Sequence, residues 1–193
     1  MVNLLPKQGV ANYLEGIFNS EECSKYLGEL LTGITWRQEP IVIFGKSVMQ
    51  PRLTAWQGDS GISYRYSGIR MEPTPWNPVV LELKARVEAV TGFRFNSALF
   101  NQYRHEKDSM GWHRDDEKEL GPHPVIASVS FGETRRFLFR HYFEKSLKKE
   151  IFLTSGSLLL MSGETQTYWE HAITKQTQPV GPRINITFRT IQN

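Results

Sequence analysis

A histidine and an aspartate stand two positions apart in the segment GWHRDDE, as His113 and Asp115. On extended backbone their side chains project to the same side, so one cation could bind both an imidazole nitrogen and a carboxylate oxygen. His171, in YWEHAI, is the candidate third ligand. Two histidines and one carboxylate leave positions on an octahedral ion open, which is the arrangement of non-haem iron(II) oxygenases. The alternative is that these are ordinary surface histidines, because an HxD pair is common by chance.

The segment PRINITFR near the C-terminus alternates polar and apolar residues, as a strand does when its two faces differ. Two arginines, an amide and a hydroxyl share its polar face. A planar, permanently charged guanidinium with neighbouring hydrogen-bond donors suits a dicarboxylate co-substrate, although a strand with one solvent-facing side shows the same alternation. Upstream, an asparagine and a tyrosine share a strand face and could line the same pocket. These residues are Arg183, Asn185, Thr187 and Arg189, with Asn101 and Tyr103 upstream.

Two helices and many short strands are expected to position these residues. Residues 20–31 carry an apolar stripe and begin at Ser20, a plausible N-cap. Residues 78–90 follow Asn77 as N-cap and end at Gly92. Strands are expected at residues 41–44, 62–66, 98–103, 126–131, 136–141, 157–161 and 183–190, and a solvated loop at the lysine-rich residues 144–150. This order predicts a mainly β protein, a sandwich or jelly roll with helices on one side.

The bulk properties set wider limits. A chain of 193 residues is expected to form one domain, and its single cysteine, Cys23, has no partner for a disulfide within the chain. The sequence has no signal-peptide pattern and no apolar run of membrane-spanning length, so we expect an intracellular, soluble protein. It would lie in the cytoplasm of a bacterium or the nucleus of a eukaryote. A net charge of +3 permits a polyanionic partner without requiring one.

The order of these motifs resembles the AlkB family of iron(II)- and 2-oxoglutarate-dependent dioxygenases, closest to its duplex-DNA repair type. The resemblance runs from about residue 41 to 191 and is strongest in NQYRHEKDSMGWHRDDEKEL, IASVSFGETRRFLFRH, SGSLLLMSGETQTYWEH and PRINITFR. It implies a double-stranded β-helix, or jelly roll, with residues 1–40 as an extension whose one helix packs on it. It also implies that His113, Asp115 and His171 bind iron. Asn101, Tyr103, Arg183, Asn185, Thr187 and Arg189 match the 2-oxoglutarate contacts, and Arg183 would grip the far carboxylate.

The resemblance further implies a set of substrate contacts. Tyr64 and Tyr66 share a strand face, so one ring could stack on a flipped base while the other bonds its edge. Without the resemblance, an amphipathic strand with partly buried rings would be the simpler interpretation. The acidic pair after the metal ligand would favour a base made cationic by alkylation, and a hairpin finger would fill the gap left by that base. The acidic pair is Asp116 and Glu117, and the finger is Phe44, Gly45 and Lys46. Arg52 and Lys46 are expected to bind phosphates of the DNA backbone.

The implied activity is oxidative dealkylation of N-alkylated bases of the 1-methyladenine and 3-methylcytosine type in DNA. It would use iron(II), O2 and 2-oxoglutarate and release an aldehyde, succinate and CO2. The expected partner is alkylated duplex DNA, with single-stranded DNA or RNA as alternatives. The protein is expected to be a monomer that does not bind a membrane. Two other functions remain open: the same chemistry on RNA or protein, and a catalytically silent β-sandwich that binds nucleic acid.

Overall fold

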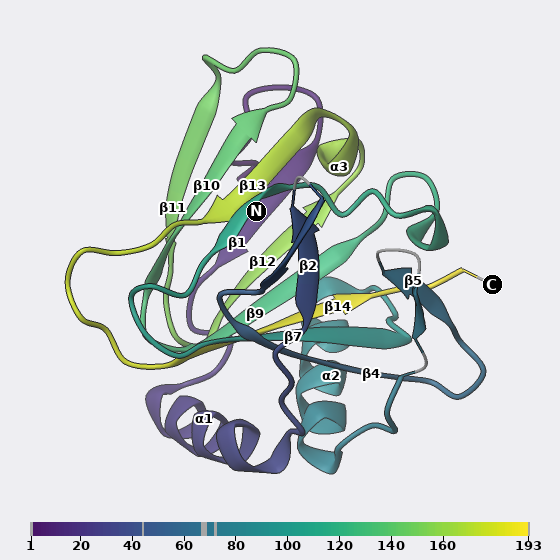
Figure 1. Ribbon diagram of the computed structural model, residues 1–193, viewed down its shortest axis with the longest axis vertical. Coiled ribbons are helices and arrows are strands. Elements are labelled where there is room, and N and C mark those ends of the chain that lie inside the picture. Colours follow the sequence, from purple (N-terminus) through teal and green to yellow (C-terminus); the bar gives the residue numbers. More distant parts are fainter. Residues whose placement is uncertain (1, 44, 67–68, 72, 193) are drawn as a thin grey trace.

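The protein is a jelly roll of two antiparallel sheets, described by a computed structural model at residues 2–43, 45–66, 69–71 and 73–192. The large sheet has the order β1-β12-β9-β14-β7-β4 and the small sheet the order β11-β10-β13-β8 (Figure 1). The large sheet comprises β1 (Val10–Leu14), β4 (Leu53–Gly58), β7 (Ser97–Tyr103), β9 (Ile126–Gly132), β12 (Ser157–Ser162) and β14 (Arg183–Arg189). The small sheet comprises β8 (Met110–His113), β10 (Arg135–His141), β11 (Lys148–Leu153) and β13 (Trp169–Ile173).

Two helices cover the outer face of the large sheet. The helix α1 (Ser20–Gly33) is capped by Asn19 in a capping box with Glu22, so the N-cap lies one residue before the expected Ser20. The helix α2 (Pro78–Thr91) begins after the expected cap Asn77 and ends at Gly92, whose φ of 77° suits glycine. Two short helical turns, η1 (Lys118–Leu120) and α3 (Thr165–Tyr168), lie between strands.

The two faces of the large sheet bury different kinds of side chain, apolar toward the helices and polar toward the small sheet on β14. Toward the helices, β14 presents Ile184, Ile186 and Phe188, which are fully buried against residues of α1 and α2. A second apolar cluster fills part of the space between the two sheets and includes Phe139 and Trp169. Because side chains alternate along a strand, the polar residues of β14 must face this space between the sheets. Every residue of β14 is buried, so its polar face is not the solvent-facing side of a surface strand.

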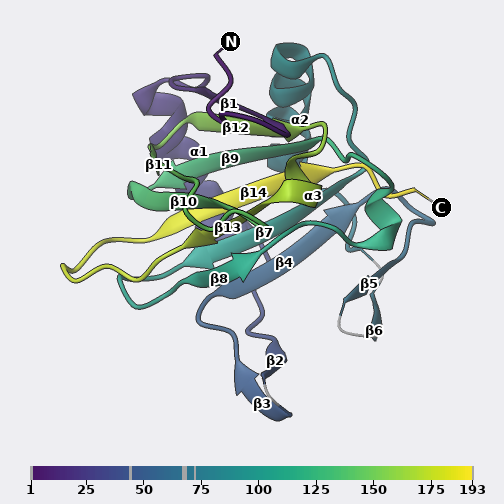
Figure 2. The same cartoon turned by 90° about the horizontal axis from the view of Figure 1, so that it is seen from above.

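Two hairpins project at the end of the molecule opposite the helices (Figure 2). One pairs β2 (Pro40–Ile43) with β3 (Lys46–Met49), and its turn contains Gly45 at a φ of 77°. The other pairs β5 (Tyr64–Tyr66) with β6 (Ile69–Met71). The finger residue Phe44 lies outside the described residues, as do the side chains of Tyr64 and Tyr66. The hairpins therefore stand beyond β4, at the edge of the large sheet.

Several sequence-based expectations need correction. The lysine-rich residues 144–150 are not only a loop, because β11 begins at Lys148 and pairs with β10. The strand expected at residues 62–66 begins only at Tyr64. The first forty residues contribute more than one helix, since β1 forms the edge strand beside β12. Among the described residues, no helix is both long and apolar enough to cross a membrane.

Candidate active site

Two neighbouring strands of the small sheet bring the three candidate metal ligands together. His113 ends β8 and lies opposite His171 of β13, and their ring centroids are 4.2 Å apart. Asp115 follows two residues later, and its Oδ2 lies 3.7 Å from Nε2 of His171. One ligand atom from each residue lies within 4.8 Å of the other two. Ligand atoms at right angles and about 2.1 Å from a metal are about 3 Å apart, so the three groups lie somewhat wider than a bound ion would hold them, at a spacing that small side-chain movements would close.

Hydrogen bonds aim these ligands at one point. The Nδ1 of His113 lies 2.9 Å from the carbonyl oxygen of Gly111, so this nitrogen donates and Nε2 keeps its lone pair for a metal. Asp115 accepts a bond from Nη2 of Arg189 at 2.6 Å through Oδ1 and donates its backbone N–H to Gln166 at 2.9 Å. Its Oδ2 therefore remains available on the side that faces His171. The donor set fits iron(II), which accepts two imidazoles and a carboxylate.

Burial and neighbouring charges hold the ligands in their metal-binding protonation states. Burial, together with the adjacent His113, lowers the pKa of His171 to about 3, so its imidazole is neutral near neutral pH. Burial alone would raise the pKa of Asp115, but the adjacent positive charge of Arg189 lowers it below its usual range. A neutral imidazole and an ionised carboxylate are the forms that bind a cation.

The strand β14 lies between β7 and β9, and this placement assembles an inner cavity beside the metal ligands. Arg183 is opposite Tyr103, and Asn185 is opposite Asn101, in the register of β14 with β7. On the other side, Asn185 and Thr187 are opposite serines of β9. The inner cavity is lined by Asn101, Tyr103, Ser128, Arg183, Asn185, Thr187 and Arg189, together with His113, Asp115 and His171. All six predicted co-substrate residues thus line one cavity that also reaches the three candidate ligands.

Arg183 is the strongest anion-binding group of the inner cavity. Its side chain is buried, with the residue 1% exposed, and its Nη2 donates to Oγ of Ser130 at 2.9 Å. Among the described residues, Nε and Nη1 have no hydrogen-bond partner. Burial lowers the pKa of Arg183 to about 10, so the guanidinium stays charged near neutral pH. A buried cation with two unused donors is costly unless a carboxylate or a similar anion completes its bonds.

The other polar residues of β14 have partners within the protein. The amide of Asn185 donates to Oγ of Ser128 at 2.7 Å and accepts a bond from Oγ1 of Thr187 at 3.2 Å. Arg189 forms its ion pair with Asp115, which orients a candidate metal ligand. Arg189 therefore does more than the co-substrate contact that the sequence suggested.

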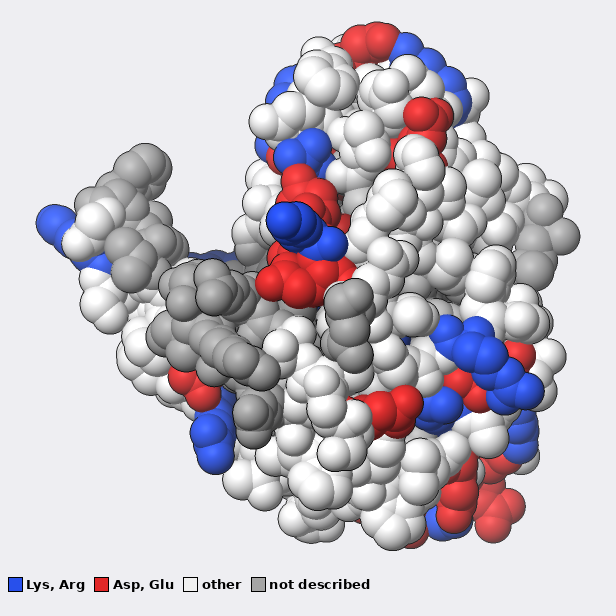
Figure 3. All heavy atoms as spheres, turned by 90° about the vertical axis from the view of Figure 1, so that its right-hand side faces the viewer, with Lys and Arg blue, Asp and Glu red and all other residues white. Residues whose placement is uncertain are grey.

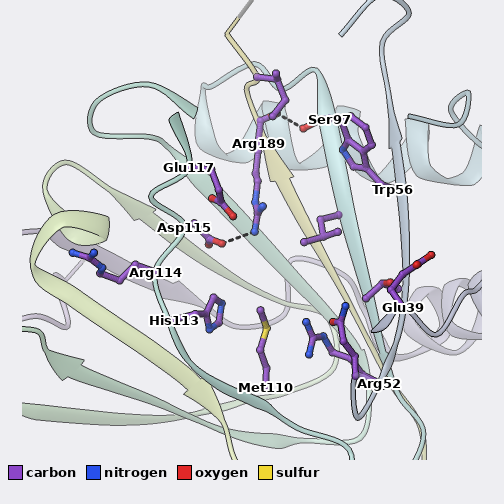
Figure 4. A pocket seen from close by; sticks show the side chains of 14 residues that line it. Glu39, Arg52, Trp56, Ser97, Met110, His113, Arg114, Asp115, Glu117 and Arg189 are labelled. Atoms are coloured by element: carbon purple, nitrogen blue, oxygen red, sulfur yellow. Dashed lines mark hydrogen bonds and ion pairs between the residues drawn. The ribbon is translucent and has the colours of Figure 1, made fainter. Parts of the chain in front are cut away.

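An outer cavity opens on the other side of the metal ligands. Glu117, Asp115 and His113 line one of its sides, and Trp56, Glu39 and Arg52 line the other (Figure 4). Met110, His113, Asp115 and Arg189 line both cavities, so the candidate metal position lies between them. A group placed in the outer cavity would thus approach the metal from the side away from Arg183.

The predicted substrate residues fall into different places. Arg52 is 6% exposed, and its Nε donates to Oδ1 of Asn101 at 2.7 Å. Arg52 is thus a buried residue that lines the outer cavity, and its contact with phosphates stays a prediction. Glu117 faces the outer cavity, whereas Asp116 is largely exposed and pairs with Arg114 at 2.5 Å. Gly45 and Lys46 lie in the β2–β3 hairpin, where Lys46 is exposed.

Sequence reasoning missed residues that hold the site together. Ser128 and Ser130 alternate along β9 and bond Asn185 and Arg183 from the neighbouring strand. Their alternation in IASVSF is a visible signal, because small hydroxyls at every second position of a buried strand share one face. Gln166, which accepts the backbone N–H of Asp115, lies in a short helical turn and has no comparable signal in the sequence.

Replacing the metal-ligand carboxylate should remove metal binding. We expect Asp115→Asn to weaken binding of iron(II), or of cobalt(II) in its place, about 100-fold or more, because the ion loses its charged ligand. Asp116→Asn is the matched control: this neighbouring side chain is 48% exposed and should change metal affinity less than about threefold. Anaerobic calorimetric titration measures both affinities. Equal affinities in the two variants would place the metal elsewhere.

Replacing the buried guanidinium should weaken binding of 2-oxoglutarate. Arg183→Lys keeps the charge but loses the planar fork, so we expect the Kd for 2-oxoglutarate to rise about tenfold or more. Arg136→Lys, at an exposed ion pair with Glu150, serves as the control and should leave this Kd unchanged. Titration of the metal-loaded protein under nitrogen checks both variants. An unchanged Kd in Arg183→Lys would exclude this role for Arg183.

Comparisons with known proteins agree with this geometry. A family model described as the 2OG-Fe(II) oxygenase superfamily matches residues 10–189. Bovine and human alpha-ketoglutarate-dependent dioxygenase alkB homolog 3 are each 43% identical over 188 residues, covering 91% of this chain. The chain spans 64% of the length of those two relatives. Mouse DNA oxidative demethylase ALKBH2 is 39% identical over 185 residues, covering 91% of this chain and 77% of the relative.

A solved structure supports the fold independently of sequence. The structure of OsALKBH1 matches with a TM-score of 0.66 at 17% identity, covering 93% of this chain and 97% of that one. The superfamily takes its name from iron(II) and 2-oxoglutarate, the metal and co-substrate that the two cavities and their ligands suit. The chain therefore belongs to the AlkB family of the 2OG-Fe(II) oxygenase superfamily.

Proposed function

We propose that this protein removes alkyl groups oxidatively from N-alkylated bases in DNA, of the 1-methyladenine and 3-methylcytosine type. One observation carries the proposal: the face formed by His113, Asp115 and His171 lies between an inner cavity that ends in an unsatisfied arginine and an outer cavity with room for a substrate group. We also propose that residues 1–193 act as one domain and as a monomer.

In this proposal, some residues bind 2-oxoglutarate and iron(II), and others position the alkyl group of the base. Arg183 and its neighbours on β7 and β14 would bind the far carboxylate of 2-oxoglutarate, and the three ligands would hold iron(II). When bound, these two groups and O2 supply the oxidation: one oxygen atom enters succinate, the other the alkyl carbon, and CO2 leaves. The hydroxylated carbon then separates from the base nitrogen as an aldehyde. The buried walls of the cavities exclude water and fix one carbon of the substrate next to the metal position.

The outer cavity suits a base made cationic by alkylation. Glu117 lines it, and its Oε2 is buried without a hydrogen-bond partner among the described residues. Such a carboxylate can stabilise a positive charge or an N–H donor on the base edge. Arg52 lines the same cavity from the opposite side and could donate to base oxygens. This pair supports an alkylated base as the substrate.

The projecting hairpins support duplex DNA as the form of the substrate. In the β2–β3 hairpin, Ile43 pairs with Lys46, and Phe44 stands between them in the sequence; we propose it as an aromatic finger. Such a finger could fill the space that a flipped base leaves in a duplex. On the face in Figure 3, described basic and acidic side chains lie interspersed, without one continuous basic area among them. On this face, local contacts rather than a broad positive field would position the DNA.

The proposal is tested by following 2-oxoglutarate turnover on defined substrates. With iron(II), O2 and an oligonucleotide containing 1-methyladenine, we expect one succinate and one formaldehyde for each base repaired, both measured by mass spectrometry. Unmodified oligonucleotide gives the background. A catalytically silent nucleic-acid-binding protein would give no succinate above this background. Turnover only with methylated RNA or with a protein substrate would reassign the substrate while keeping the chemistry.

The duplex preference is tested at the hairpin tip. Phe44→Ala should slow repair of methylated duplex about tenfold and repair of the same single strand much less, because only the duplex has stacking to restore. Val48→Ala, at an exposed position on β3 of the same hairpin, is the control. Repair rates on both substrates and melting temperatures are compared. An equal loss on both substrates with a lower melting temperature would show that Phe44 packs in the core instead.

A further inference from the structure

A continuous strip of stacked aromatic and cationic side chains begins beside the metal ligand His113. Trp112 carries the guanidinium of Arg140 over its ring, at 4.1 Å from the centroid. Tyr142 carries Arg114 at 4.2 Å and Lys145 at 4.6 Å from its centroid. We call Trp112, Arg140, Lys145, Tyr142 and Arg114 the cation–aromatic strip. These three contacts, at 4.1 to 4.6 Å, are shorter than the other cation–ring contacts among the described residues, which lie at 5.2 to 5.9 Å.

A single carboxylate joins the two halves of the strip. Oε1 of Glu170 accepts bonds from Nε of Arg140 at 2.7 Å and from Nζ of Lys145 at 2.5 Å. Glu170 is mostly buried, so the two cations are held in place over their aromatic rings. Glu170 uses Nε of Arg140 and one N–H bond of Lys145, which leaves the two Nη groups of Arg140 and the other N–H bonds of Lys145 for a ligand. The strip is therefore preorganised, and its side chains lose little conformational entropy when a ligand binds.

The strip lies on the outer side of the small sheet and reaches the outer cavity. Glu170 and Arg140 are opposite each other on β13 and β10, and both point away from His171, because side chains alternate along a strand. Trp112 likewise points away from the ligand His113. Arg114, the residue after that ligand, lines the outer cavity and also stacks on Tyr142. The strip thus runs from the mouth of the outer cavity onto the surface.

Aromatic rings remain available to a ligand along the strip. Trp112 is 38% and Tyr142 is 40% exposed, and Tyr142 meets Phe143 edge to face. Arg140 lies over the ring of Trp112, whereas Arg114 and Lys145 both lie over the ring of Tyr142, so a base would stack on the exposed part of each ring or on the guanidinium above it. Exposed rings next to cations that keep free N–H groups are the combination that binds single-stranded nucleic acid, where the rings stack on bases and the cations contact phosphates. Trp, Tyr and Arg are also enriched in protein interfaces, so the choice of nucleic acid rests on the continuity of the strip with the outer cavity, which Arg114 lines, rather than on composition.

We infer that the cation–aromatic strip binds unpaired nucleotides next to the alkylated base, with Trp112 and Tyr142 stacking on their bases. The inference rests on the proposed function, because it takes the outer cavity as the position of the alkylated base. It adds a second contact region that extends from the outer cavity, which Arg114 lines, onto the surface. Paired bases cannot offer their faces to the strip, so on the proposed duplex substrate it would bind nucleotides beside the lesion whose pairs have opened.

The inference is tested by a binding cycle that needs no turnover. The probes are two fluorescein-labelled 15-nucleotide single strands with one central 1-methyladenine; in the second, the three nucleotides on each side are abasic but keep their phosphates. Trp112→Ala with Tyr142→Ala should weaken binding of the intact probe about tenfold, the effect of losing about 1.4 kcal/mol of stacking. The same variant should bind the abasic probe as the unaltered protein does. Fluorescence anisotropy measures all four affinities.

Matched variants keep the result interpretable. Phe152→Ala removes another exposed aromatic ring, on β11 of the same sheet but outside the strip, and should leave both affinities unchanged. Tyr142→Ala alone tests the strip without altering β8, where Trp112 adjoins a metal ligand, and Trp112→Tyr should restore most of the affinity. Unchanged binding of the intact probe, or an equal loss on both probes, would overturn the inference. Absence of succinate with the unaltered protein would instead refute the proposed function. The binding measurements on the two probes would still test whether the strip binds nucleotides.

Discussion

Two buried guanidinium groups on β14 govern the arrangement of the site. Charges enclosed between two sheets must be paired or hydrogen-bonded, since an unpaired buried charge costs several kcal/mol. Arg189 meets this requirement inside the protein through Asp115, and the same contact orients a metal ligand. Arg183 meets it only in part, through Ser130, and its remaining donors face the inner cavity. The protein thus uses one arginine to organise its own carboxylate and keeps the other for a carboxylate from outside.

Much of the site could be predicted from the sequence because its pattern is local. The alternation in PRINITFR assigns each residue of β14 to one face, and the spacing of His113 and Asp115 puts both on one side of the chain. What the alternation could not decide was whether the polar face met solvent or protein. That depends on the small sheet, which covers the face from segments far away in the chain. The family resemblance supplied this tertiary information, which periodicity alone lacks.

Other features depend on contacts that no local pattern reveals. The strand β11 begins inside a lysine-rich segment that resembles a solvated loop, and it forms because β10 offers it a partner. Arg52 was predicted only as a phosphate contact, yet it is buried and donates to Asn101, at the wall of the outer cavity. The cation–aromatic strip collects side chains from β8, β10 and the β10–β11 connection around Glu170 of β13. The partner of Arg52 and Glu170 of the strip are distant in sequence, so their effect on burial could not be inferred from neighbours in the chain, whereas β11 pairs with the preceding strand and was hidden by its lysine-rich composition.

The division of ligands between the two sheets has a mechanical consequence. His113 and His171 belong to the small sheet, whereas Arg183, Asn101 and Tyr103 belong to the large sheet. A dicarboxylate held at one end by Arg183 and at the other by the metal would span the seam and act as a removable cross-link between the layers. Such a cross-link stabilises the closed sandwich by the free energy of its binding. Each catalytic cycle would convert this linking dicarboxylate to succinate. The contact between the two sheets would then be less stable during the interval in which succinate leaves and a new 2-oxoglutarate binds.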